Sequence, residues 1–283
     1  MTGSLAWWLV VATAAATVVL LVVIGLAHAV ARARRRRQVR TREAVAPLLL
    51  DITDGADVPT PTRRREARML AEAAAALVHK VRGADRDALA AWLEAHGFRD
   101  EALAGLRARS AVRRAASIEL ALAIDDDPAP VLPLVADPHP QVRATAVRML
   151  GAAGHASAIP TIVGAAVSPR RGVSMSVAAM SLVQVGPTSA EAFGAVWTSA
   201  DPRARRLAVE VTGRLGLADG RRRVEHELGS DDPRLRRSAA EALARIGSPL
   251  STTALEAALA RAVPGTEEQR AVREALVTLQ EDA

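Results

Sequence analysis

The chain has 283 residues, half of them apolar but only 2% aromatic, and contains no cysteine, which excludes disulfides, thiolate metal sites and a cysteine nucleophile. The formal charge of +6 comes entirely from residues 1–43, because the remaining residues hold 30 basic and 30 acidic side chains. A neutral domain lacks the uncompensated Lys and Arg that nucleic-acid binding requires, so we expect no nucleic-acid partner.

The first predicted element is a membrane anchor over residues 1–31. Residues 5–31 contain no Asp, Glu, Lys or Arg. Because about 20 apolar residues suffice to cross a bilayer as a helix, this segment is long enough to span one. Aromatic and basic residues flank this run as at the two interfaces of a membrane span: Trp7, Trp8, Arg34, Arg35, Arg36 and Arg37. We therefore expect a single-pass protein of the cytoplasmic (inner) membrane that contacts the lipid bilayer, with its N-terminus outside and the remainder in the cytoplasm.

A cleaved secretory signal is the alternative for this segment, since Ala27-His28-Ala29 resembles a cleavage site. The run is longer than the apolar region of a signal peptide, and no basic residue precedes it. These two features favour the retained anchor.

Residues 32–62 are predicted to be a basic juxtamembrane segment and linker, because 51–62 is rich in Asp, Thr, Gly and Pro. Residues 63–109 are predicted to be a helical cap, with helices over 63–81, from Asp85 to Gly97, and over 100–108. A further helix is expected over 110–124. Asp125, Asp126 and Asp127 follow it, and their spacing is unlike that of a calcium loop, so an exposed turn is predicted.

Residues 110–283 show an internal period of 31 residues. The segment 201–206, DPRARR, recurs at 232–237 as DPRLRR, and four repeats begin near Asp137, Ser168, Ser199 and Ser230. A period of this length predicts stacked pairs of helices that bury their apolar faces against neighbouring repeats. Asp and Pro are expected to cap the first helix of a repeat, and Gly to end it. Repeat 2 departs from the pattern, so its helix boundary stays open.

The same register predicts the core of the repeats. Two sets of positions recur every 31 residues: Ile162, Phe193, Val224 and Leu255, and then Ala166, Trp197, Leu228 and Leu259. Trp197 is therefore predicted to be a core residue and not a platform for a ligand.

The pattern at 137–154, D-P-x-P-x-V-R-x-x-A-x-x-x-L-G-x-x-G, followed by Ala158-Ile159-Pro160, resembles the HEAT-like repeats of phycobilisome lyases. The resemblance covers residues 137–263, with a degenerate repeat over 106–136. It implies an all-α, right-handed solenoid after the predicted transmembrane helix. It also implies that Arg143, Arg205 and Arg236 pair with turn Asp residues and backbone carbonyls across adjacent repeats.

No catalytic motif stands out. The six histidines form neither H-x-x-x-H nor H-E-x-x-H, the glycines are expected at helix ends, and no G-x-S-x-G elbow or phosphate loop occurs. His226-Glu227 is one HE pair, whereas the HEAT family of deoxyhypusine hydroxylase holds di-iron with several. We expect no catalytic residue, metal or cofactor.

The layout resembles bacterial membrane-anchored HEAT proteins, which implies a non-catalytic, membrane-tethered scaffold or adaptor. Its expected partner is a protein, which the resemblance suggests could be a membrane glycosyltransferase, bound on a concave surface made by the second helices. The candidate partner surface consists of four basic residues: Arg170, Arg171, Arg221 and Arg222. The alternative is a lyase-like or modifying enzyme with a site in the groove, and the oligomeric state stays open.

Overall fold

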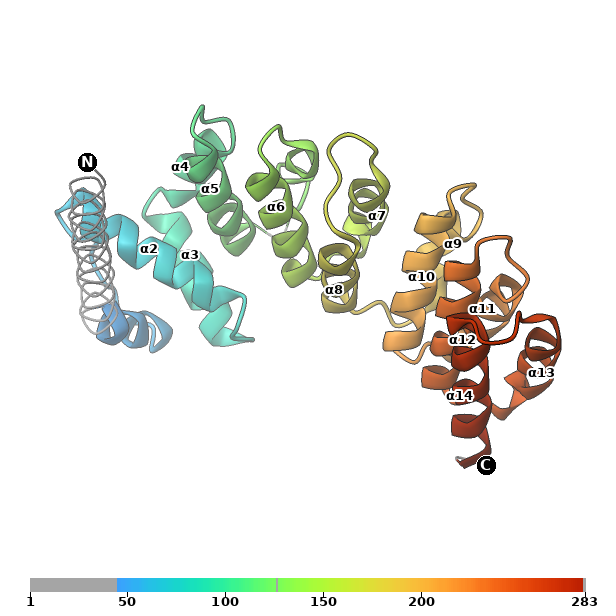
Figure 1. The fold of residues 1–283 in the computed structure, drawn as a ribbon. Helices are drawn as coiled ribbons and strands as arrows, with labels where there is room; N and C mark the ends of the chain where they lie inside the picture. The colour runs from blue at the N-terminus through green and yellow to red at the C-terminus, as the bar shows by residue number, and fades with distance from the viewer. Residues whose placement is uncertain (1–44, 126, 282–283) are drawn as a thin grey trace, which may run out of the picture. The chain divides into compact units, whose positions relative to one another are not determined.

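The computed structural model describes residues 45–125 and 127–281, and the chain divides into two units at Ala73 and Ala74. All regular secondary structure within the described residues is helical (Figure 1). None of the described helices combines the length and the apolar character that a membrane crossing needs. The predicted inner-membrane location is therefore corrected. The predicted anchor, including Trp7, Trp8 and Arg34 to Arg37, lies outside the described residues.

In the first unit, residues 45–53 are helical, so the irregular segment begins later than the predicted linker. The helix extends past residue 51 because Ile52 is almost completely buried, with 2% of its surface exposed. The chain leaves the helix at Gly55, whose φ of 79° is a conformation that glycine adopts without strain. Helix α2 (Arg64–Val78) then begins close to the predicted position.

The second unit opens with α3 (Ala84–Ala95), α4 (Phe98–Leu106) and α5 (Ala111–Ile124). Gly83 occupies the N-cap of α3, and the predicted cap residue Asp85 lies inside the helix instead. Trp92 of α3 packs against His96 and Phe98, with ring centroids 4.5 and 5.8 Å away. Helix α4 packs along α5, and Ser110 caps α5 by accepting a hydrogen bond from the Arg113 N–H.

The repeats follow as pairs of helices (Figure 1). The first helices are α6 (Pro140–Ala153), α8 (Met175–Val185), α10 (Pro202–Arg214) and α12 (Pro233–Ile246). The second helices are α7 (Ile159–Val167), α9 (Gly194–Trp197), α11 (Arg221–Glu227) and α13 (Thr252–Arg261). Helix α14 (Glu267–Glu281) continues the layer of first helices, in which α6 packs on α8, α10 on α12 and α12 on α14. Short 3-10 turns precede second helices: Ala156–Ala158, Ala190–Phe193, Ala218–Gly220 and Pro249–Ser251.

The expected capping pattern is confirmed in repeats 3 and 4. Asp201 and Asp232 occupy the N-caps of α10 and α12, and their carboxylates accept the N–H groups of Arg203 and Arg234. Repeat 1 is different, because His139 occupies the N-cap of α6 without a side-chain hydrogen bond. Asp137 lies two residues earlier, where its carboxylate accepts the His139 N–H and also binds Arg114.

Repeat 2 shows why its boundary could not be read from the period. The register of α6 would start its first helix at residue 171, whereas α8 starts at Met175. Ser174 forms the N-cap and accepts the Val177 N–H at 3.3 Å. Residues 168–174 therefore form an extended loop before α8, and Gly186 ends the helix as the sequence suggested.

The predicted core register is confirmed. Ile162, Phe193, Val224 and Leu255 are all fully buried, and Ala166 and Leu228 are 8% and 3% exposed. Leu259 is only partly buried, although it packs against the core. Trp197 is half-buried between two parts of the core, and its indole N–H donates to the Ala190 carbonyl at 3.1 Å. Its contacts match the predicted core role.

Two glycines lie inside first helices, which corrects the expectation that the glycines end helices. A Cβ atom at Gly151 would lie 2.7 Å from the Cα of Ser181, and one at Gly213 would lie 2.6 Å from the Cα of Ala242. These separations are shorter than any normal contact between carbon atoms. The missing side chains thus allow α6 to approach α8, and α10 to approach α12, backbone to backbone.

Candidate partner-binding surface

Four arginines recur at the start of helices α5, α6, α10 and α12, and we call them the ladder arginines: Arg114, Arg143, Arg205 and Arg236. The Nη1 atom of each donates to the carbonyl six residues earlier, at 2.8, 2.9, 2.6 and 2.8 Å respectively. The predicted role of Arg143, Arg205 and Arg236 in binding backbone carbonyls is confirmed. The carbonyls belong to the turn before each arginine's own helix, and not to an adjacent repeat.

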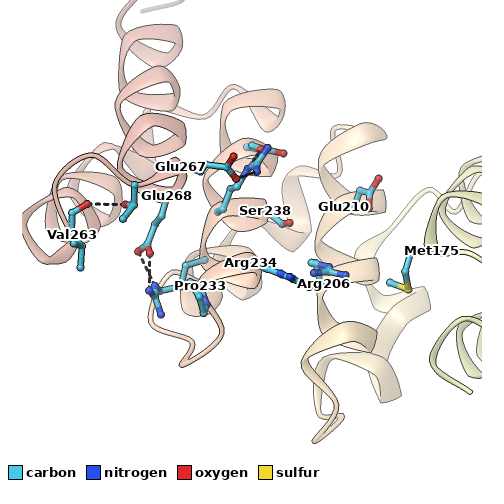
Figure 2. A pocket seen from close by; sticks show the side chains of 13 residues that line it. Met175, Arg206, Glu210, Pro233, Arg234, Ser238, Val263, Glu267 and Glu268 are labelled. Atoms are coloured by element: carbon cyan, nitrogen blue, oxygen red, sulfur yellow. Dashed lines mark hydrogen bonds and ion pairs between the residues drawn. The ribbon is translucent and has the colours of Figure 1, made fainter. Parts of the chain in front are cut away.

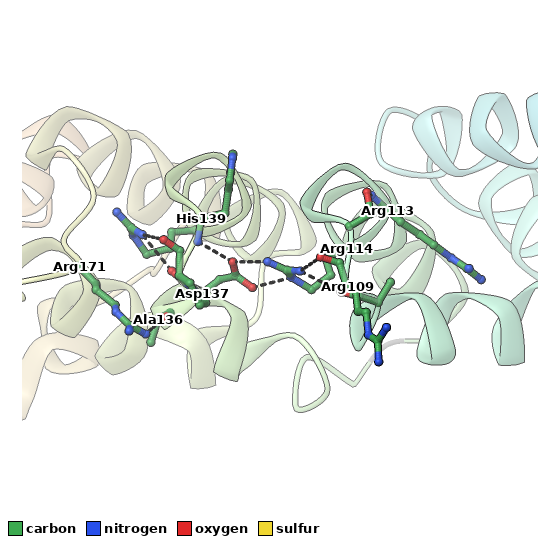
Figure 3. A network of polar contacts seen from close by, with 11 residues as sticks. Arg109, Arg113, Arg114, Ala136, Asp137, His139 and Arg171 are labelled. Atoms are coloured by element: carbon green, nitrogen blue, oxygen red, sulfur yellow. Dashed lines mark hydrogen bonds and ion pairs between the residues drawn. The ribbon is translucent and has the colours of Figure 1, made fainter.

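The carboxylate partners of the ladder differ from the expected turn aspartates. Arg205 binds Glu227 of α11, and Arg236 binds Glu268 of α14 through both Nε and Nη2. Only Arg114 pairs with a turn aspartate, Asp137, with both nitrogen–oxygen distances at 2.8 Å (Figure 3). The Arg114–Asp137 and Arg236–Glu268 pairs therefore join successive units of the stack, whereas the Arg205–Glu227 pair joins the two helices of repeat 3.

The polar network around Asp137 changes the pKa of this buried carboxylate. Burial disfavours its charged form, but hydrogen bonds from the Arg114 guanidinium and the His139 N–H outweigh burial and lower the pKa of Asp137 below its usual value. Figure 3 shows the carboxylate between these two donors. Asp137 is therefore held ionised and acts as a structural link between α5 and the turn before α6.

The structure does not bring the predicted partner residues together. Arg170 and Arg171 lie in the loop before α8, where Arg171 donates to the Ala136 carbonyl at 3.2 Å. Arg221 and Arg222 begin α11, next to the opposite end of the first helices, and Arg221 is bound to Glu225. A first helix of 13 residues such as α10 is about 20 Å long. Arg170 and Arg171 therefore lie at one end of the layer of first helices, and Arg221 and Arg222 lie at the other end.

A pocket of about 740 Å³ lies on the exposed side of the first helices (Figure 2). Side chains of α8, α10, α12, the start of α14 and the segment before it line the pocket, so it crosses three successive repeats. The second helices, which were expected to carry the binding surface, contribute no residue to this pocket.

Register explains how these residues come to lie in a row. Met175, Arg206 and Arg237 are separated by 31 residues and lie on α8, α10 and α12. Glu210 and Glu241 form a second row one turn further along α10 and α12. Because the first helices stack in register, the sequence repeat places a row of arginines next to a row of glutamates on the surface.

Most charges in the pocket are paired. Arg237 binds both Glu241 and Glu267, and Glu210 binds Arg214 at 2.7 Å. Arg206 and Arg234 are the exception, because neither side chain has a carboxylate partner among the described residues. Figure 2 shows both pointing into the pocket, with Met175 beyond Arg206.

One exposed apolar side chain lines the pocket, and another contacts Arg214, the partner of the pocket residue Glu210. Val263 in the pocket is 64% exposed, and Met180 of α8 is 49% exposed with its sulfur 3.4 Å from the guanidinium of Arg214. A surface that combines exposed apolar groups with unpaired guanidinium groups can bind a polypeptide that carries both apolar and acidic side chains.

A second pocket, of about 620 Å³, contains the His226-Glu227 pair that the sequence singled out. Glu227 is 4% exposed, and both of its carboxylate oxygens lie within 3.3 Å of the Arg205 Nε. His226 is exposed at the pocket edge. A metal ion at this pair would have to displace Arg205 from the carboxylate, so the pair fits an ion-pair role better than a ligand role.

Elsewhere in the described residues, no group of three or more His, Asp or Glu side chains is arranged to hold a metal ion. Asp127 instead accepts the Ala129 N–H at 2.9 Å, and Asp125 pairs with Arg99. The described aspartates of the 125–127 run thus stabilise a turn, as the sequence suggested.

Several solved structures are similar to the chain at low identity. The chain is similar to an engineered protein (18% identity, 83% of this chain and 68% of that chain, TM-score 0.40). It is also similar to the CpcE–CpcF complex of phycocyanin lyase from Nostoc sp. (16%, 79% and 98%, 0.30) and to human deoxyhypusine hydroxylase in complex with glycerol (15%, 86% and 98%, 0.30). Likeness at this level carries no inference about activity.

No curated protein matches the chain. A family model for HEAT repeats matches residues 128–193 and 190–277, which together make up more than half of the sequence. The matched region contains all four repeats of the 31-residue period, with the helix pairs and the buried register described above. The chain therefore belongs to the HEAT-repeat family.

Proposed function

We propose that the chain is a non-catalytic scaffold that binds a protein partner on the exposed side of its first helices. The observation that carries this proposal is the pocket of about 740 Å³ across three repeats, in which Arg206 and Arg234 lack carboxylate partners. Both guanidinium groups line the same pocket, and an acidic partner would supply the negative charge that they lack. The partner we propose is a polypeptide segment with acidic side chains next to apolar ones.

A glycosyltransferase partner rests on resemblance alone and forms no part of the proposal. A lyase-like or modifying activity in the groove is the alternative, but the described pockets devote their buried carboxylates to arginines, as at Glu227 and Glu268. A carboxylate whose oxygens already accept hydrogen bonds from an arginine is poorly placed to take a proton from a substrate.

Site-specific photo-crosslinking in the organism that makes the protein tests the proposal. A photo-reactive residue at Ser238, which is half-buried in the pocket, should capture a discrete protein through a peptide rich in Asp or Glu. The same group at Arg222, exposed at the other end of the layer, is the matched control and should not. Adding Arg206→Glu and Arg234→Glu should abolish capture at Ser238.

Two results would contradict the scaffold. Equal capture at Ser238 and Arg222, unaffected by the charge reversals, would show that the pocket is not the binding surface. A captured protein that is chemically modified only when the chain is present would favour the enzyme alternative.

A further inference from the structure

The pocket of about 620 Å³ that contains Glu227 is separate from the pocket of Figure 2, and the two share no lining residue. The end of α9, the end of α11 and the turns before α10 and α12 line it. Pockets of roughly 300–1,000 Å³ hold small ligands, so a long side chain has room here. The chemistry of the lining residues indicates what kind of group could enter.

The charges that line this pocket do not balance. Arg205 is bound to Glu227, and its Nη1 donates to the Ser199 carbonyl at 2.6 Å. Asp231 is the second acid of the pocket, and its exposed side chain has no hydrogen bond or ion pair in the described part of the chain. With histidine counted as neutral, the pocket therefore carries one net negative charge, that of Asp231.

Arg236 of α12 does not serve as the counterion of Asp231. The two charges attract one another, but the Nε and Nη2 atoms of Arg236 donate to Glu268 at 2.7 and 2.6 Å. Its Nη1 atom donates to the backbone carbonyls of Ser230 and Asp231, and not to a carboxylate. Because Glu268 already balances Arg236, the carboxylate of Asp231 stays available to a group from outside.

The repeat itself does not use the side chain of Asp231. Asp232, the next residue, caps α12 and accepts the Arg234 N–H at 2.9 Å. One period earlier, the position of Asp231 is taken by Ala200, which lines the same pocket. The negative charge of the pocket is thus additional to the capping pattern of the solenoid.

The uncharged residues of the pocket add hydrogen-bond acceptors and an aromatic ring. The hydroxyl oxygens of Ser199 and Ser230 each accept the N–H two residues later, at 3.2 and 3.3 Å, and each oxygen has a second lone pair. Trp197 is half-buried, and its indole N–H already donates to the Ala190 carbonyl. Trp197 therefore offers a ligand its ring and not a donor.

We infer that this pocket binds a guanidinium group supplied from outside the chain, with Asp231 as the counterion and Trp197 as the aromatic surface. A guanidinium group carries five N–H donors in one plane, binds a carboxylate through two of them and stacks on aromatic rings. These properties match the acceptors and the ring that line the pocket. The source is either an arginine side chain of a bound polypeptide or a small free guanidinium compound. The inference does not depend on the proposed function, which concerns the other pocket.

Fluorine nuclear magnetic resonance of the full chain labelled with 5-fluorotryptophan tests the inference. The signal of Trp197 is identified by its loss in Trp197→Phe. N-acetyl-arginine N-methylamide should shift this signal to a saturating value, whereas N-acetyl-citrulline N-methylamide, its neutral isostere, should not. Trp92 of α3 lies outside the pocket, so its signal is the internal control and should not move.

Substitutions at Asp231 test the counterion. Asp231→Asn should weaken binding of the capped arginine by about fivefold, the factor that the loss of one exposed ion pair implies. Asp231→Glu keeps the charge and should retain binding. Asp85→Asn removes the same charge at an exposed position of α3 and should leave binding unchanged.

Methylguanidinium distinguishes the two sources. Binding as tight as that of the capped arginine indicates a small guanidinium compound, and weaker binding indicates an arginine side chain.

Three results would overturn the inference. These are a Trp197 signal that the capped arginine and the capped citrulline shift equally or not at all, equal shifts of the Trp197 and Trp92 signals, and an unchanged affinity in Asp231→Asn.

Discussion

Arg114 of α5 and Asp137 of the turn before α6 form a two-pronged ion pair, with Nε–Oδ2 and Nη2–Oδ1 distances both of 2.8 Å. Only 15% of the arginine side chain and 4% of the aspartate side chain are exposed. The pair links a helix in front of the clear repeats to repeat 1. An ion pair between an arginine and a carboxylate thus also connects helices in front of the region in which the 31-residue period is visible.

Asp137→Asn should lower the unfolding temperature by several degrees. The amide can still accept the His139 N–H, but it cannot balance the charge of Arg114, which would stay partly buried without a counterion. Thermal unfolding followed by circular dichroism at pH 7 measures the change. Asp231→Asn, at an exposed aspartate with no side-chain partner in the described chain, is the control. Equal effects of the two changes would show that the buried pair contributes nothing to stability.

Stability should fall in acid, and the sign follows from three aspartates. Hydrogen bonds from Arg203 lower the pKa of Asp201, and those from Ser189 lower the pKa of Asp219. At Asp137, burial opposes the lowering but hydrogen bonds from Arg114 and His139 outweigh it. A lowered pKa in the folded state means that the stabilisation is fully present above the ordinary value of 3.8 and is lost as the pH falls through the folded value.

Chemical denaturation between pH 7 and pH 2.5 checks this expectation. The free energy of unfolding should stay nearly level down to about pH 5 and then decrease, because the unfolded chain binds more protons than the folded one. Asp219→Asn should make the decrease shallower. A free energy that rises toward low pH would contradict the assigned direction of these pKa shifts.

More of the fold than of the candidate site could be predicted from the sequence, because burial follows the sequence period and ion-pair partners do not. Burial repeats with the period, so Ile162 and Leu255 could be assigned to the core from spacing alone. Partners in ion pairs do not repeat in this way: Arg205 finds its acid 22 residues away on α11, and Arg236 finds its acid 32 residues away on α14. Such partners depend on how helices pack, which spacing does not encode.

The pocket was missed for a similar reason. The row of Met175, Arg206 and Arg237 was visible in the sequence as one register position. Spacing alone does not show which side of the helix pair carries a pocket, because that depends on how the helices pack in space. The first helices pack closely at Gly151 and Gly213. A signal for this packing was present, because the two glycines are 62 residues apart, or two periods, and both lie inside helices.

Gly213→Ala should therefore destabilise the protein, although alanine is the better helix former. A Cβ atom at this position would lie 2.6 Å from both Cα and Cβ of Ala242, so α10 and α12 would have to separate. Overpacking of this kind costs about 1–3 kcal/mol. Urea denaturation measures the change.

Gly164→Ala is the matched control for this change. Gly164 lies inside α7, and a Cβ atom there would meet nothing within 4 Å. Since the new side chain only reduces the freedom of the unfolded chain, this variant should be more stable by about 0.5–1 kcal/mol. If both variants were stabilised, the backbone contact between α10 and α12 would be disproved.

Leu255→Asp tests the register of the whole solenoid at its C-terminal end. Leu255 is fully buried in the core that α11, α12, α13 and α14 share, so the substitution places an unpaired carboxylate among apolar side chains. We expect a loss of at least about 4 kcal/mol, or unfolding of the last repeats. Arg222→Ala, at an exposed position that begins α11, should leave the unfolding midpoint unchanged. Hydrogen exchange should show lost protection in 252–281 for Leu255→Asp alone, and similar behaviour of the two variants would mean that the assigned register is wrong.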